Sequence, residues 1–202
     1  MPRPTSGFPR ITPMETTMTG SVSTAHASTL WIVLLTVAST ATTLVFACAT
    51  PFPALAALAA LHMRQRDGLI LMLLSWLVSQ AVGFGLLGYP REPQTFLYAV
   101  DLLTAALGSA LAAYAVLRRM ERASFAVRLI AAYVAAFVAF KLVALVWALF
   151  LGGVEAAYSL EVLTRQFARN GAILLGMLAL YHLLVRIGLP GAPAALARAQ
   201  AA

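Results

Sequence analysis

Three polar residues interrupt the long apolar runs of this chain, and their chemistry is the most informative feature of the sequence. Lys141 lies near the middle of the run 129–150, which is about as long as a lipid bilayer is thick. An ammonium group inside lipid needs a polar partner or a wet cavity, so the neighbouring runs must supply one. Asp101 and Gln80, which lie within two other runs, are the candidates.

The depths of these residues predict that they meet. At about 1.5 Å per helical residue, Asp101 lies roughly 9 Å, Gln80 roughly 12 Å and Lys141 roughly 17 Å from the same membrane surface. The lysine side chain is long enough to extend several ångströms toward that surface. Asp101 also shares a helix face with small residues such as Gly108, and such a face packs against protein. We therefore expect one polar layer.

Two interpretations of this layer are open. In the first, Lys141, Asp101 and Gln80 line a binding pocket or a substrate path. In the second, Lys141 and Asp101 form a structural ion pair that determines which helices pack together. Breaking a buried pair costs about 3–5 kcal/mol of stability under either interpretation, so the presence of the residues does not separate them.

His182 is a further candidate, because it lies eleven residues into the run 171–189, one turn before Arg186. It could serve as a proton relay, since histidine titrates near neutral pH. The alternative is a histidine bonded to a backbone carbonyl or lying near the lipid headgroups. His26, His62 and His182 are far apart, with no histidine or carboxylate three or four residues on, so no metal site and no cofactor are predicted.

Composition places these residues in a membrane protein. Of the 202 residues, 61% are hydrophobic and 10% are charged. Soluble domains average about 45–50% apolar and about 25% charged, so this chain could not cover a water-facing surface. The net charge of +7 comes from arginines between the apolar runs, a pattern typical of membrane topology and anionic headgroups rather than of nucleic-acid binding. The fold class predicted is an all-α, polytopic transmembrane helix bundle.

The first apolar run, 29–63, is interrupted at Thr50-Pro51-Phe52-Pro53. A single straight helix of this length would measure roughly 50 Å, well over the ~30 Å of hydrocarbon. Each half alone has about 16 residues, fewer than the ~20 that a crossing needs. We therefore predict one crossing that is broken at Pro51 and Pro53, which makes five crossings in all. Six crossings are the alternative.

The remaining chain supplies four more crossings and an interfacial helix. The crossings are predicted at 68–88, 95–117, 125–153 and 171–189. A short amphipathic helix at about 155–169 is predicted to lie in the membrane interface, with Glu161 and Arg165 paired on its wet side and a stop at Asn170-Gly171. Residues 29–189 thus form the bundle, and residues 1–28 and 190–202 are predicted to be disordered tails.

The arginines predict the orientation. With five crossings, one side of the membrane carries Arg64, Arg66, Arg118, Arg119, Arg122, Arg128, Arg186 and Arg198. The other side carries Arg91, Arg165 and Arg169 near the membrane. Basic loops stay in the cytoplasm, so the N-terminus is predicted outside and the C-terminus inside, in a bacterial inner membrane.

The function predicted from these features is that of a small permease, or of the membrane subunit of a transporter, with a polar site inside the membrane. The broken first helix supports this, because broken helices often mark midplane binding sites. The alternative is a non-catalytic assembly or anchoring subunit of a larger membrane complex. No recognisable nucleophile–base constellation is present, so we do not predict an enzyme. The expected partners are the lipid bilayer and other membrane subunits or a second copy of the chain, and not nucleic acid.

Overall fold

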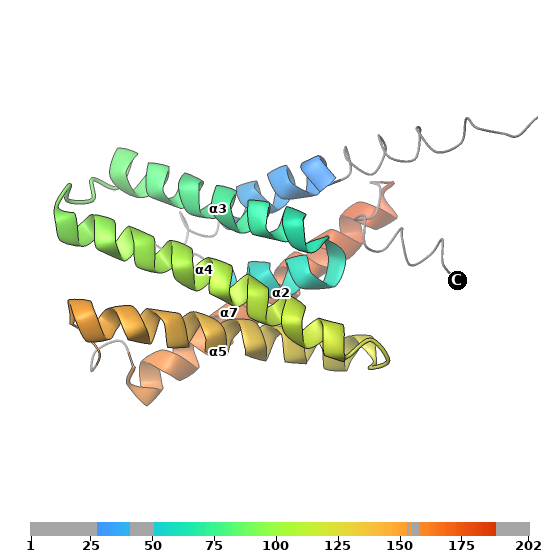
Figure 1. Ribbon diagram of the computed structural model, residues 1–202. Coiled ribbons are helices and arrows are strands. Elements are labelled where there is room, and N and C mark those ends of the chain that lie inside the picture. Colours follow the sequence, from blue (N-terminus) through green and yellow to red (C-terminus); the bar gives the residue numbers. More distant parts are fainter. Residues whose placement is uncertain (1–27, 41–50, 153, 155–157, 189–202) are drawn as a thin grey trace, which may run out of the picture.

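The computed structural model describes residues 28–40, 51–152, 154 and 158–188, and all the regular structure in these ranges is helical. Figure 1 shows the helices as a layered bundle. They are Ser28–Thr40, α2 (Phe52–His62), α3 (Gln65–Gly85), α4 (Pro93–Arg119), α5 (Phe125–Leu151) and α7 (Leu160–Arg186). The predicted all-α class therefore holds for the described residues. The predicted tails, 1–28 and 190–202, lie outside them except for Ser28.

Four of the helices are long and apolar enough to cross a membrane. α3 has 21 residues, and α4, α5 and α7 have 27 each. At about 1.5 Å per residue they measure roughly 30–40 Å, which matches or exceeds the hydrocarbon core. Their length and composition suggest a membrane location. The predicted count of five crossings is not confirmed, because the first apolar run contains no helix of this length in its described part.

α2 is a short helix at the centre of the bundle. All eleven of its residues are buried, and it packs against α3, α4, α5 and α7 (Figure 1). Its last residue, His62, contacts Phe125 at the start of α5, and its first, Phe52, stacks on Phe140 near the middle of α5. α2 therefore fills only one half of the bundle's length. An all-apolar helix of this kind is surrounded by protein on every side.

A helix does begin where the prolines predicted a break. α2 starts at Phe52, directly after Pro51, and carries Pro53 in its first turn. Proline is favoured at this place because the first-turn N–H groups have no partner within the helix. The residues that join Ser28–Thr40 to α2, 41–50, lie outside the described residues.

The contacts of the described residues do not support the predicted single crossing by residues 29–63. Ser28 donates a hydrogen bond to the Asp67 carboxylate at 2.8 Å, near the start of α3. Trp31 and His62 both pack on the ring of Tyr181, at centroid distances of 4.6 and 4.2 Å. The segment therefore begins and ends at the same end of the bundle. Its two helices are each too short to cross lipid. α2 is wholly buried against protein, whereas Ser28–Thr40 buries Trp31, Ile32 and Leu35 on one face.

The ends of the bundle follow from these contacts. The arginine-rich end is the one where Ser28–Thr40 begins, α2 ends and α7 approaches its last residue, Arg186. The arginines of this end are Arg64, Arg66, Arg118, Arg119, Arg122, Arg128 and Arg186. The opposite end, called the far end, has Arg91, Arg165 and Arg169. Ser28 and Arg186 thus lie at one end, so the predicted opposite placement of the two termini does not hold for the described residues.

Residues 160–169 of the predicted interfacial helix at 155–169 belong to α7, which runs without interruption from Leu160 to Arg186. The predicted stop at Asn170-Gly171 is therefore wrong. Asn170 lies within α7, and its side-chain amide donates to the carbonyl oxygen of Gln166 one turn earlier. The Glu161–Arg165 pair is confirmed at 3.9 Å, with both side chains largely exposed.

Candidate functional site

Asp101 and Lys141 line the same pocket, which lies toward the far end between α4, α5 and the segment before α7. Its volume is about 270 Å³. The polar lining residues are Tyr98, Asp101, Lys141 and Tyr158, and the rest of the wall is formed by Ala144, Ala148 and Gly152. We call this the Asp101–Lys141 pocket. Asp101 is eight residues from the start of α4 and Lys141 ten from the end of α5, so both lie roughly 12–15 Å inside their helices.

Close packing of α4 against α5 fixes the two charged residues in register. Ser109 is fully buried and donates to the carbonyl oxygen of Ala136 at 2.9 Å. Gly108, one of the small residues predicted to face protein, lies against Val143, where an added Cβ would be 3.2 Å from that side chain. Small residues let two backbones approach closely, which holds Asp101 and Lys141 on adjacent helices.

The Tyr158 side chain contacts both the backbone and the side chain of Lys141. Its hydroxyl donates to the Lys141 carbonyl oxygen at 2.8 Å, and the Lys141 ammonium lies 5.1 Å from the centre of its ring. A cation at this distance from an aromatic ring is attracted to it. Burial, and then the negative charge of Asp101, raise the pKa of Tyr158. The phenol is therefore protonated at neutral pH and able to donate.

Asp101 and Lys141 are near each other but do not form an ion pair. The two side chains are not within the 4.0 Å that defines an ion pair. The Oδ1 atom of Asp101 is buried and has no hydrogen-bond partner. A buried carboxylate oxygen without a partner is costly, and a bound solute or water would supply what it lacks.

Gln80 does not join the pocket. Its amide donates to Ser79 on its own helix, α3, at 3.3 Å. The contact from α3 to α4 is made instead by Trp76, whose indole N–H donates to the Ala99 carbonyl oxygen at 2.8 Å. The predicted layer therefore contains two of its three members.

His182 lies elsewhere. It is exposed on α7, four residues before the end of that helix, and its ring meets the edge of Tyr181. It does not line the Asp101–Lys141 pocket. Its role as a proton relay stays a prediction.

Two residues that matter here were not predicted from residue spacing. Tyr158 contacts Lys141 twice. His62 is buried, its Nδ1–H donates to the carbonyl oxygen of Leu58 at 3.1 Å, and its ring packs on Tyr181. Neither contact has a signal in the sequence, because Tyr158 is 17 residues from Lys141 and His62 is far from Tyr181 along the chain.

No group of three or more histidine, cysteine or carboxylate side chains is arranged to hold a metal ion within the described ranges. Comparison with family models, with curated proteins and with solved structures finds no match to this chain.

Proposed function

We propose that the chain is an integral membrane protein with four crossing helices, and that it acts as a small permease or as the membrane subunit of a transporter. The observation that carries the proposal is the Asp101–Lys141 pocket: two opposite charges at membrane depth share about 270 Å³ without pairing. Charged residues inside the membrane are costly and most often serve a solute path. An unpaired cation and anion in one small pocket fit a small solute that carries both charges.

The proposed topology adds a re-entrant pair of helices to the four crossings. Ser28–Thr40 and α2 enter from the arginine-rich end, and α2 begins near the level of the bundle's middle. Basic residues favour the cytoplasmic side, so we infer that the arginine-rich end faces the cytoplasm of a bacterium and that the pocket lies in the outer half of its inner membrane. Ser28 and Arg186 are then both on the cytoplasmic side.

Flux through vesicles tests the proposal. Purified protein is reconstituted into liposomes that contain a pH dye, and uptake of a mixture of labelled amino acids and of protons is measured. Asp101→Asn and Lys141→Met should each reduce the flux at least tenfold. Glu92→Gln is the matched control, because it removes an exposed carboxylate just before α4. Folded variants whose flux and ligand binding equal those of the wild type would rule out the transport proposal.

Access to the pocket is tested separately, because Lys141 is the only lysine in the chain. A membrane-impermeant amine reagent added to one side of oriented vesicles should label Lys141 from the far end and not from the arginine-rich end. Mass spectrometry of the peptide containing Lys141 separates this label from the one on the terminal amine. Labelling from the arginine-rich end alone would contradict the proposed opening.

The contact of Tyr158 with Lys141 favours a second candidate, a non-catalytic assembly or anchoring subunit. In that case Lys141 serves to fix the segment after α5, and nothing passes through the pocket. The double variant Lys141→Met/Asp101→Leu separates the two functions. A structural role predicts that the double variant recovers the stability that each single variant loses. It also predicts that neither the double variant nor the wild type gives any flux.

A further inference from the structure

The arginine-rich end carries a cavity that the proposed transport function does not use. It has a volume of about 510 Å³ and lies between the C-terminal part of α2, the end of α4 and the start of α5. Its floor is apolar, with Ala60, Met63 and Leu117, all buried. Its rim is polar and holds Arg118, Arg128 and Glu121.

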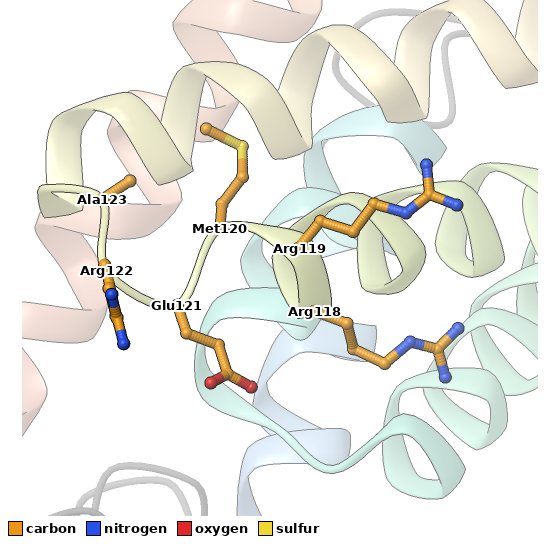
Figure 2. A pocket seen from close by; sticks show the side chains of 6 residues that line it. All are labelled: Arg118, Arg119, Met120, Glu121, Arg122 and Ala123. Carbon is orange, nitrogen blue, oxygen red and sulfur yellow. The ribbon is translucent and has the colours of Figure 1, made fainter.

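A second hollow adjoins this cavity and shares two of its residues. It has a volume of about 430 Å³ and is lined by residues 118–123. Figure 2 shows Arg118 and Arg119 extending side by side from the last turn of α4, with Glu121 and Arg122 in the turn that follows. Three arginines and one carboxylate therefore line this hollow.

These arginines have spare hydrogen-bonding capacity. In the part of the chain that the structure describes, no carboxylate lies within 4.0 Å of the guanidinium groups of Arg118, Arg119, Arg122 or Arg128. The Nε of Arg128 is buried and has no hydrogen-bond partner. The interaction of Arg118 with the Gln65 side chain is long, at 3.4 Å. Guanidinium groups bind phosphate through paired N–H groups, and Arg118 directs only one of its nitrogens, Nη1, to a partner among the described residues.

We propose that this cavity binds an anionic phospholipid, with the lipid phosphate between Arg118 and Arg128. The apolar floor of Ala60, Met63 and Leu117 then receives the glycerol and the first part of an acyl chain. The apolar floor favours a lipid over a free phosphate, because a free phosphate has no apolar part to bury against it. The cavity also lies where the membrane-crossing helices end, at the level of headgroups. The inference does not depend on transport.

Lipid titration tests the site on the full-length protein. Delipidated protein in detergent is titrated with dioleoyl-phosphatidylglycerol, dioleoyl-phosphatidylcholine or inorganic phosphate, and bound lipid is counted by native mass spectrometry alongside the thermal midpoint. Phosphatidylglycerol should bind and raise the midpoint, and the other two should not. Arg118→Gln and Arg128→Gln should each weaken phosphatidylglycerol binding by about fivefold, the effect of one basic residue near a lipid surface.

Two controls make the result specific. Arg91→Gln removes an exposed arginine at the far end and should leave binding unchanged. Arg118 is exposed, so its variant is expected to fold even if Arg128→Gln does not. Equal binding of both lipids, an equal effect of Arg91→Gln, or stabilisation by inorganic phosphate at the same concentration would each overturn the proposal.

Discussion

The two halves of the bundle are held together in different ways. In the arginine-rich half, α2 fills the centre, and the Tyr114 hydroxyl lies 3.1 Å from the carbonyl oxygens of both Ala59 and Arg64. In the far half, beyond the level where α2 begins, α4 and α5 enclose the Asp101–Lys141 pocket. One half therefore has an apolar centre with charges at its rim, and the other has charges within.

Because of this difference, we expect substitutions in the two halves to affect different properties of the protein. Close packing of apolar side chains leaves few ways to rearrange, so a substitution in the arginine-rich half should lower the free energy of unfolding. The far half contains a buried carboxylate oxygen without a partner, which stabilises nothing by itself. Substitutions there should change ligand binding or titration more than they change folding.

The largest effect is expected in α2. Leu58 is 1% exposed, so Leu58→Ala leaves a cavity and should lower the free energy of unfolding by about 2–5 kcal/mol. Leu142→Ala is the matched control, since Leu142 is 58% exposed on α5 beside Lys141 and should cost about 0.5 kcal/mol or less. Reversible unfolding in detergent micelles measures both. Equal losses would remove the distinction between the two halves.

A smaller effect is expected at Gly68, where α3 meets α4. A Cβ added at Gly68 would lie within 3.0 Å of the ring and hydroxyl of Tyr114, so Gly68→Ala should cost about 1–3 kcal/mol. Gly85→Ala on the same helix meets nothing within 4 Å and should be neutral or stabilising, because alanine favours helix.

The cause of the Gly68 effect is tested by a double-mutant cycle in the same unfolding assay. Tyr114→Phe removes the hydroxyl and keeps the ring, so the Gly68→Ala/Tyr114→Phe variant should lose less stability than the sum of the single variants. Simple additivity would mean that the hydroxyl of Tyr114 is not what the new methyl group meets.

The sequence predicted α3, α4 and α5 well, and the first segment and the start of α7 poorly. Long apolar runs bounded by arginines and by Pro90 or Pro93 are a strong signal, and α3, α4 and α5 begin and end within a few residues of the prediction. A run of apolar residues has the same composition whether the helix faces lipid or is buried in protein. α2 is wholly buried and α5 has four buried residues among 27, although both helices are mainly apolar.

The candidate site was predicted in part for a related reason. Depth along a helix follows from residue counting, which predicted that Asp101 and Lys141 lie at one level, and both residues line the same pocket. Rotation of α3 about its own axis decides where Gln80 points, and residue counting does not fix that rotation. The contact of Tyr158 with Lys141 depends on how the chain reverses after α5, for which the sequence carries no periodic signal.

The smallest effect concerns the titration of Tyr158 in the far half. Burial and the charge of Asp101 raise the pKa of Tyr158 above its ordinary value of about 10. The folded state therefore holds the phenol proton more tightly than the unfolded state does. The resulting stability is complete below pH ~10 and is lost as the pH rises through the folded-state pKa.

Tyrosinate absorbance measures this titration. The chain has six tyrosines, so the wild-type curve minus that of Tyr158→Phe isolates one group, whose midpoint should lie above pH ~10. Asp101→Asn should lower the midpoint, because it removes a negative charge that opposes ionisation, and Glu92→Gln should not. If Asp101→Asn leaves the midpoint unchanged, the carboxylate and Tyr158 do not share a pocket. That result would contradict the description of the far half as one with charges in its interior.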